Sequence, residues 1–217
     1  MIIRDKREHL FSLEKDGTVV AVPAGGWTIL DCLIDDILKR INGSIVEIGM
    51  GESTEIFAIH AKKYGRKLYS CDLVMGGRFN CFNEPLFDDH KCFIGKSEDF
   101  IKQFDDKIAV IFIDGEHTAK TVRMEIAGLF PLLSQWGVMF LHDTFPHREK
   151  LLESGKAGDV YKVRQELEKN QDIDVFTWPY TANSFGLTMV MKHELNKYRD
   201  YWKKNGRALS GGLNETV

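Results

Sequence analysis

Short apolar runs rich in branched residues alternate with longer amphipathic stretches through the middle of the chain. The apolar runs predict buried strands over residues 44–48, 67–71, 91–94, 108–113 and 137–141. The amphipathic stretches predict helices over residues 54–63, 97–104 and 118–133. This alternation is typical of βαβ units, whose parallel strands are apolar along their whole length because helices cover both faces of the sheet.

The pattern changes after Leu141. A helix predicted over residues 158–170 is followed by the runs DIDVFTWP and GLTMVMK, with a turn-like segment at residues 180–186 between them. Two strands joined by so short a link pair antiparallel. We therefore expect an α/β fold, a Rossmann-like three-layer sandwich with a seven-stranded, mostly parallel sheet and an antiparallel C-terminal hairpin.

The segments outside this alternation predict less regular structure. Residues 27–41 have apolar positions at helical spacing on one side, so this helix should pack on the sheet, with the segment before it covering the site. Residues 74–90 are rich in Gly and Asn and predict a long loop with at most one short helix. Its aromatics Phe79, Phe82 and Phe87 either line an acceptor pocket or anchor the loop to the core.

Composition bounds the class of protein. The 217 residues suit one domain, and 43% apolar with 28% charged residues is the composition of a soluble globular protein. The net charge of -3 gives no basic surplus for nucleic acid, so we expect none as a partner. The four cysteines predict reduced thiols, and no apolar run approaches the roughly 18 residues that span a membrane. These features favour a cytoplasmic protein with no membrane partner.

Ligands of open parallel sheets lie beyond the carboxyl ends of the strands, so polar residues there are the candidates for function. The first predicted strand ends in VEIGMGEST, where Gly49 and Gly51 allow a tight turn and a close ligand. A plain strand-to-helix turn is the alternative interpretation. Glu47 lies inside the buried strand and needs a partner there, either backbone amides or a cationic ligand group.

The next strand ends offer residues for a nucleoside. Asp72 follows the glycine turn by about twenty residues, the position from which a carboxylate accepts both ribose hydroxyls. Leu73 beside it presents an apolar surface to a base. The third strand leads into GKSEDF, where Ser97 or Glu98 either reads an adenine edge or serves at the helix start.

The fourth and fifth strands end in titratable residues. Asp114 follows six apolar residues in FIDGEHT, and His142 with Asp143 ends the neighbouring strand, so these side chains should project beside one another. For Glu116 we favour helix capping. His117 is either an ordinary first-turn residue or a catalytic or ligating one, and Asp143 has the alternative role of a turn former.

These motifs together resemble the class I S-adenosylmethionine-dependent methyltransferases, in particular the branch of cephalosporin-hydroxylase-like and sugar or polyketide O-methyltransferases. The matching stretches are VEIGMGEST, SCDL, IFIDGEHTAKTV and GVMFLHDT, and TWPYTANSFGLTMVMK resembles the reversed last strand of that family. The resemblance spans about residues 24–192. It implies a single domain over residues 1–217, with an N-terminal helical cap at 1–43, a cofactor-binding core at 44–192, and a C-terminal helix and frayed tail at 193–217.

The resemblance also implies roles for individual residues. Glu47, Gly49 and Gly51 would hold the methionine portion of S-adenosyl-L-methionine, Asp72 its ribose, and Ser97 with Leu73 its adenine, with Asp114 closing the cofactor site. In metal-using members of the group, a divalent ion such as Mg²⁺ is bound by the residues that here are Asp114, His142 and Asp143.

Methyl transfer to oxygen needs an acceptor aligned with the sulfonium and a means of removing its proton. A histidine base, with His117 and His142 as candidates beside Asp143, or a divalent metal would supply that means. The expected function is therefore O-methylation of a small-molecule hydroxylated acceptor, and a homo-oligomer is compatible with the sequence. A nucleotide-dependent oxidoreductase and a non-catalytic cofactor-binding module are the alternatives.

Overall fold

The computed structural model describes residues 12–13, 19–20, 27–78, 80–146, 149–152, 156–179 and 185–192. Its elements, in chain order, are β1 (Ser12–Leu13), β2 (Val19–Val20), α1 (Trp27–Arg40), β3 (Ser44–Ile48), α2 (Glu52–Tyr64), β4 (Leu68–Asp72), β5 (His90–Ile94), α3 (Ser97–Gln103), β6 (Ile108–Ile113), α4 (Ala119–Leu129), η2 (Phe130–Leu132), β7 (Leu133–His142), η3 (Glu149–Leu152), α5 (Val160–Leu167), β8 (Ile173–Trp178) and β9 (Leu187–Lys192).

Seven strands of the described residues form one sheet in the order β5-β4-β3-β6-β7-β9-β8. The pairs among β5, β4, β3, β6 and β7 are parallel, whereas β9 runs antiparallel to both β7 and β8. The predicted sheet, with its antiparallel closing hairpin, is therefore confirmed. The strand order reverses between β3 and β6, and this is the point where open parallel sheets bind ligands.

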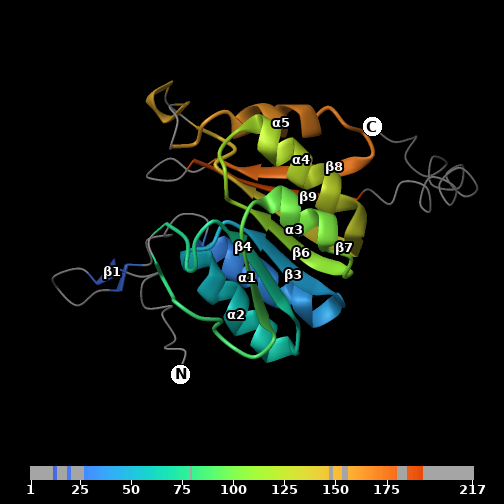
Figure 1. The fold of residues 1–217 in the computed structure, drawn as a ribbon. Helices are drawn as coiled ribbons and strands as arrows, with labels where there is room; N and C mark the ends of the chain where they lie inside the picture. The colour runs from blue at the N-terminus through green and yellow to red at the C-terminus, as the bar shows by residue number, and fades with distance from the viewer. Residues whose placement is uncertain are drawn as a thin grey trace, which may run out of the picture.

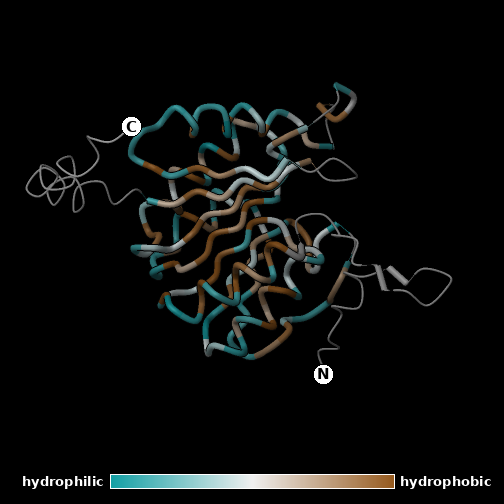
Figure 2. The backbone as a smooth tube through the Cα atoms, turned by 180° about the vertical axis from the view of Figure 1, so that it is seen from behind, coloured by the Kyte–Doolittle hydropathy of each residue, from teal (hydrophilic) through white to brown (hydrophobic). Residues whose placement is uncertain are grey.

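Helices cover both faces of the sheet, as the prediction of three layers requires (Figure 1). Alternate residues of each strand enter two different cores because successive side chains point to opposite faces. Phe112 packs with α1 and α2 on one face, and Ile111 packs with α3, α4 and α5 on the other. Figure 2 shows the strands as apolar segments inside a more hydrophilic rim of helices and turns.

Several predicted boundaries were wrong by a few residues. The helix predicted over residues 118–133 ends at Leu129, because Phe130–Leu132 tighten into a 3-10 turn at Pro131. The strand predicted over residues 137–141 begins earlier, at Leu133, and contains an irregularity where Trp136 takes a φ of 67°. The helix predicted over residues 158–170 covers only Val160–Leu167.

The other expectations are met where they can be followed. Residues 74–89, apart from residue 79, form turns and bends without a helix, and α1 packs its apolar side on the sheet as predicted. The four cysteines, all in the described part, form no disulfide. The segment just before α1 and residues 193–217 lie outside the described residues.

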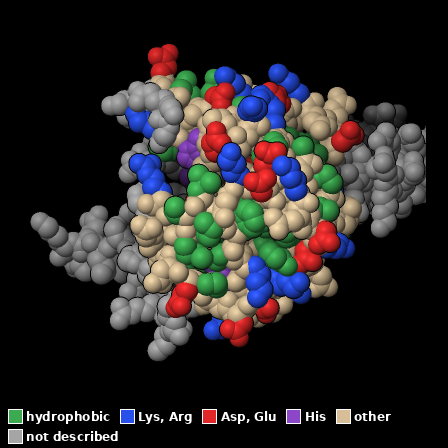
Figure 3. Space-filling model, viewed as in Figure 1, with side chains coloured by type: hydrophobic (Ala, Val, Ile, Leu, Met, Phe, Trp, Pro, Cys, Tyr) green, Lys and Arg blue, Asp and Glu red, His purple; other side chains and the backbone are tan. Residues whose placement is uncertain are grey.

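The described surface carries charged side chains of both signs. Among the described residues on the face in Figure 3, basic and acidic side chains are interspersed. No helix in the described ranges has the length and apolar character that crossing a bilayer requires.

Candidate functional site

Two aspartates and two histidines meet beyond the carboxyl ends of β6 and β7. Nδ1 of His142 lies 3.2 Å from Oδ1 of Asp114 and 3.0 Å from Oδ1 of Asp143. Nε2 of His117 lies 3.4 Å from Asp114 Oδ1, and its Nδ1 lies 3.1 Å from Asp143 Oδ2. The two strands are neighbours in the sheet, so the juxtaposition predicted for Asp114, His142 and Asp143 is present.

His117 is held in this cluster by the segment that leads into α5. Its Nδ1 hydrogen-bonds to the carbonyl oxygen of Lys156. The backbone N–H of Asp159 donates to the carbonyl of His117 over 3.3 Å, and a Cβ at Gly158 would lie 1.9 Å from that same oxygen. Only a glycine with a positive φ of 55° fits there, so the contact between the two segments is close and specific.

Asp143 is held in an unusual backbone conformation. Its φ is 59°, and its side chain is almost fully buried. Non-glycine residues in the left-handed region are uncommon and persist where the surrounding structure determines them. The next residue supplies that constraint, because Thr144 Oγ1 accepts a hydrogen bond from Thr188 Oγ1 over 2.7 Å and its carbonyl accepts from Arg164 Nε over 3.0 Å.

The cluster is an ion-paired one. Burial disfavours the charged form of each group, but the attraction of His142 and the hydrogen bonds from both histidines outweigh it and hold the pKa of Asp114 below its ordinary value. In the same way, the two aspartates raise the pKa of His117 to about 9 and that of His142 to about 10, against the effect of burial.

A compact set of ligand atoms lies in this cluster. Asp114, His117 and Asp143 each offer one atom suited to a metal ion, and these atoms all lie within 4.8 Å of one another. The predicted third member, His142, was wrong for this set: the geometry places His117 there instead, while His142 Nδ1 contacts both carboxylates. Which of the two histidines lies where could not be read from the sequence, because the contact of His117 with Lys156 spans 39 positions.

The glycine turn after β3 packs directly against β6. Gly49 has a φ of 92°, and a Cβ there would lie 2.1 Å from the carbonyl oxygen of Asp114, so only glycine fits. A Cβ on Gly51 would meet no atom within 4 Å, which leaves open space above the turn. The two predicted glycines thus have different roles, close packing for Gly49 and an open backbone for Gly51.

Asp72 braces the same turn from β4. Its Oδ2 accepts a hydrogen bond of 2.8 Å from the backbone N–H of Met50, and its Oδ1 accepts one of 3.3 Å from that of Val74. Each carboxylate oxygen can accept more than one hydrogen bond, so capacity for hydroxyl groups remains. Leu73 beside it is 68% exposed, which leaves its apolar surface available to a ligand.

Glu47 lies fully buried beneath the glycine turn, as predicted, but its partners differ from the expected ones. Ser53 Oγ donates to Oε1 over 2.6 Å and Ser70 Oγ donates to Oε2 over 2.8 Å, so hydroxyls take the place of backbone amides. Burial raises the pKa of Glu47 to about 8, against the effect of these hydrogen bonds. Glu47 is therefore mostly a neutral acid near pH 7, unlike Asp114.

Ser97 begins α3 and has a buried neighbour that the sequence pattern did not reveal. Glu125 of α4 is 1% exposed, and neither of its carboxylate oxygens has a hydrogen-bond partner among the described residues; burial raises its pKa to about 7, against the opposite effect of nearby Ser97. An acid on the apolar side of an amphipathic helix was the available signal, since Val122 and Leu129 lie three and four positions away. The position of Glu125 in α4 does not reveal which residue lies beside it.

The remaining candidates have structural roles. The predicted helix cap at Glu116 was wrong: the N-cap of α4 is Thr118, whose side chain accepts from the backbone N–H of Thr121, while the exposed Glu116 accepts from the side-chain hydroxyl of Thr121 over 3.0 Å. Phe82 and Phe87 pack on the ring of His90, so they anchor the loop after β4 to the core. Phe79 lies outside the described residues.

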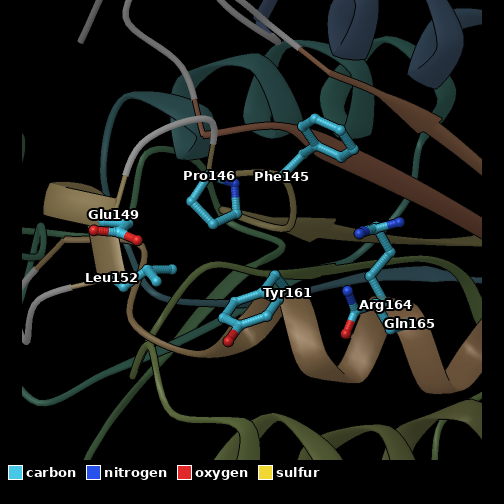
Figure 4. Close-up of a pocket in the computed structure, with 7 residues that line it drawn as sticks. All are labelled: Phe145, Pro146, Glu149, Leu152, Tyr161, Arg164 and Gln165. Atoms are coloured by element: carbon cyan, nitrogen blue, oxygen red, sulfur yellow. The ribbon is translucent and has the colours of Figure 1, made fainter.

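A cavity of about 350 Å³ lies between the loop after β7 and helix α5 (Figure 4). In the sequence, its first lining residue comes two positions after Asp143. It is lined by Phe145, Pro146, Glu149, Leu152, Tyr161, Arg164 and Gln165. The Arg164 guanidinium lies 5.0 Å from the centre of the Phe145 ring, a cation–π contact that fixes one wall. None of these residues stood out in the sequence, because the pocket depends on how the loop after β7 folds against α5.

Solved structures with a similar fold include methyltransferases. SAH-bound methyltransferase PaMTH1 of Podospora anserina is similar with a TM-score of 0.57 and 19% identity, over 75% of this chain and 77% of that one. Cofactor-bound Rv0187 from MTB has a TM-score of 0.60 and 15% identity over 83% and 84% of the two chains. MycE of the mycinamycin biosynthetic pathway, in complex with Mg and SAH, has a TM-score of 0.51 and 14% identity over 76% of this chain and 48% of that one.

The sequence matches no curated protein sequence. Residues 46–144 match the model of a methyltransferase domain, a range that runs from β3 through the residue after Asp143 and so includes the glycine turn, Asp72 and the whole ion-paired cluster. The match to a methyltransferase domain and the similarity in fold to a solved methyltransferase agree with the predicted resemblance to the class I S-adenosylmethionine-dependent methyltransferases more than with the oxidoreductase alternative.

Proposed function

We propose that the protein transfers the methyl group of S-adenosylmethionine to an oxygen atom of a small hydroxylated acceptor. The observation that carries this proposal is the cluster of Asp114, His117, His142 and Asp143 directly beside the glycine turn. In-line displacement at a sulfonium requires an aligned acceptor that loses its proton. The glycine turn serves the cofactor, and the cluster serves the acceptor.

The cofactor in this proposal lies across the ends of β3, β4 and β5. The open space at Gly51 admits the methionine portion, with Glu47 beneath the turn, and Asp72 accepts the ribose hydroxyls. The exposed side chain of Leu73 covers one face of the adenine, and Ser97 at the start of α3 lies at its edge. Covering an exposed leucine with a flat ring removes apolar surface from water, which favours binding.

A divalent ion fits the residues at the acceptor side. Two carboxylates and an imidazole from two segments, the loop after β6 and the end of β7, with ligand atoms within 4.8 Å of one another, make a donor set suited to Mg²⁺ or Mn²⁺. Asp114, His117 and Asp143 would hold the ion, and His142 would orient the two carboxylates it contacts. When bound, such an ion lowers the pKa of a coordinated hydroxyl and fixes its position.

The protein's own groups handle the acceptor and its proton. His117 and His142 are the two side chains of the cluster that can take a proton from a hydroxyl when they are neutral. The cavity between the loop after β7 and α5 offers rings and polar groups to the body of an acceptor, with Phe145 only two positions after Asp143. An acceptor with an apolar body and a hydroxyl at one end matches this lining.

Calorimetric titration with S-adenosylhomocysteine tests the cofactor half of the proposal, and the absence of binding at millimolar ligand would sink it. The acceptor half is tested by incubating the protein with S-adenosylmethionine and matched pairs of alcohols and amines of the same skeleton. Release of S-adenosylhomocysteine with the alcohols is the expected result, and release with the amines alone contradicts O-methylation.

A further inference from the structure

A buried chain of hydrogen bonds connects the loop after β4 to the glycine turn. The backbone N–H of Leu86 donates to Nδ1 of His90 over 3.1 Å. Nε2 of His90 lies 3.1 Å from Ser70 Oγ, and Ser70 donates over 2.8 Å to Glu47. Ser53, in the first turn of α2, donates to the other oxygen of Glu47 over 2.6 Å. Four segments, on β3, β4, β5 and α2, are joined in this way.

The direction of each hydrogen bond is fixed by its partners. His90 Nδ1 accepts from a backbone N–H, so the ring proton is on Nε2, which lies 3.1 Å from Ser70 Oγ and 3.3 Å from Cys92 Sγ; the hydroxyl oxygen is the stronger acceptor of the two. Ser70 is thereby left to donate its own proton to Glu47. A second proton on His90 would set two N–H groups against each other at Leu86, so the chain requires a neutral imidazole. Burial is consistent with this, since it lowers the pKa of His90 to about 4.

His90 is also the residue on which the loop is packed. The Phe87 ring stacks on it with centroids 6.0 Å apart, and the Phe82 ring lies at 5.8 Å. His90, Ser70 and Glu47 are each 0–1% exposed, so none of them reaches solvent. Water cannot replace a partner that is removed, and each missing hydrogen bond leaves a buried polar atom unsatisfied.

We propose that Ser70 and His90 are positioning residues for the cofactor: through Glu47 and Ser53 they fix the glycine turn on which the methionine portion binds, and they tie that turn to the loop at residues 81–89. The inference rests on the proposed function, since the turn is taken to bind S-adenosylmethionine. Neither residue touches the cofactor. Loss of the chain lets Glu47 and the first turn of α2 adopt other arrangements, so the binding-competent one is less populated.

The test uses two substitutions that separate the hydrogen bond from the ring. In His90→Gln the side-chain amide reaches the position of Nε2 and can still donate to Ser70, whereas in His90→Asn it reaches only the position of Nδ1. Both variants lose the ring that packs on Phe82 and Phe87. Binding of S-adenosylhomocysteine is measured by calorimetry, and the melting temperature is recorded for the same samples.

We expect His90→Asn to weaken binding about ten-fold and His90→Gln by about three-fold or less, with similar losses of melting temperature. Phe87→Leu is the matched control: it lowers the melting temperature through lost packing and leaves the affinity at the wild-type value. Equal weakening by Asn and Gln, or weakening by Phe87→Leu as large as that by His90→Asn, overturns the positioning role and leaves a purely structural one.

Ser70→Ala is the second route if the His90 variants do not fold. It keeps the loop and its aromatic packing and removes only the link to Glu47, so about ten-fold weaker binding is again expected and an unchanged affinity overturns the inference. Wild-type protein is titrated first. Failure of the wild-type protein to bind S-adenosylhomocysteine counts against the proposed function, whereas a wild-type affinity in all the variants counts against Ser70 and His90 alone.

Discussion

The two halves of the sheet bury the same kinds of side chain in opposite states. Under the glycine turn, Glu47 has a raised pKa of about 8 and His90 a lowered one of about 4, because burial dominates and their partners are hydroxyls and aromatic rings. At the ends of β6 and β7, Asp114 has a lowered pKa and His142 a raised one of about 10, because each faces the opposite charge.

The difference teaches that a buried acid or histidine has no fixed charge state of its own. Burial favours the neutral form in both halves, and only a neighbouring opposite charge reverses this. The half around the glycine turn, which the proposed function makes the cofactor half, is therefore a neutral hydrogen-bonded network. The half at the ends of β6 and β7, which the proposed function makes the acceptor half, is an ion-paired cluster. Substitutions should therefore have different effects in the two halves, and the largest effect is expected in the ion-paired cluster.

Removing one charge from the cluster should have the largest consequence. We expect millimolar Mg²⁺ or Mn²⁺ to raise the melting temperature of the wild-type protein, because an ion that binds only the native state stabilises it. Asp114→Asn and Asp143→Asn should abolish this response and reduce methyl transfer by two orders of magnitude or more, on the order of the 10²–10³-fold that one electrostatic contact supplies. The melting temperatures of the wild-type protein and both variants, measured with and without the ion, test this prediction.

The matched control is Glu116→Gln, which removes an exposed acid two positions after Asp114, in the loop before α4. Its ion response should equal that of the wild-type protein. An undiminished shift in both aspartate variants would show that the ion binds elsewhere.

Neutralising the acid should cost little stability in one half and much in the other. Glu47→Gln replaces a group that is already mostly neutral near pH 7, so we expect the free energy of unfolding to change by less than about 1 kcal/mol. Asp114→Asn leaves the imidazolium groups of His117 and His142 to share Asp143 as the one remaining carboxylate of the cluster, and we expect a loss of about 3 kcal/mol. Urea denaturation at pH 7 measures both, and similar losses in the two variants would remove the distinction between the halves.

The pH dependence of stability should have opposite signs for the histidines of the two halves. His90 titrates at about pH 4 in the folded protein and near 6.5 when unfolded, so its contribution to stability is lost as pH falls from about 6.5 to 4. His117 titrates at about pH 9 when folded, so its contribution is complete below about pH 6.5 and is lost as pH rises through 9.

Unfolding free energies of the wild-type, His90→Asn and His117→Asn proteins between pH 4.5 and 9.5 test these signs. The difference between wild type and His90→Asn should widen with rising pH over the acid range. The difference between wild type and His117→Asn should shrink over the alkaline range. Parallel curves for all three proteins would contradict the assigned charge states.

The smallest effect is expected at the exposed edge of the cofactor half. Leu73 is 68% exposed, so Leu73→Ala should leave the melting temperature unchanged and weaken binding of S-adenosylhomocysteine about three- to five-fold through lost contact with the base. Val74→Ala, at the next exposed apolar position, is the control and should change neither quantity. Calorimetric titration of both variants with S-adenosylhomocysteine tests this prediction. Equal affinities of the two variants would show that Leu73 does not contact the ligand.

Much of the fold could be predicted because its signals are local. The run at residues 108–113 is apolar at every position, and β6 occupies the same residues, Ile108–Ile113. Element ends were less accurate, since the bulge near Trp136 and the 3-10 turn at Pro131 depend on how β7 fits beside β6. The candidate site residues Asp72 and Asp114 lie where the sequence placed them, at strand ends, and strand ends of a parallel sheet face the ligand.

Sequence by itself determined the succession of strands along the chain and the residues that lie at their ends, since both follow from short-range periodicity and the geometry of a parallel sheet. Tertiary structure alone decided which of these residues are charged. Glu47 meets Ser70 across 23 positions, and His117 meets Lys156 across 39, so neither partner could be inferred from spacing. A buried group takes its charge from its neighbours, and those neighbours come together only when the sheet forms.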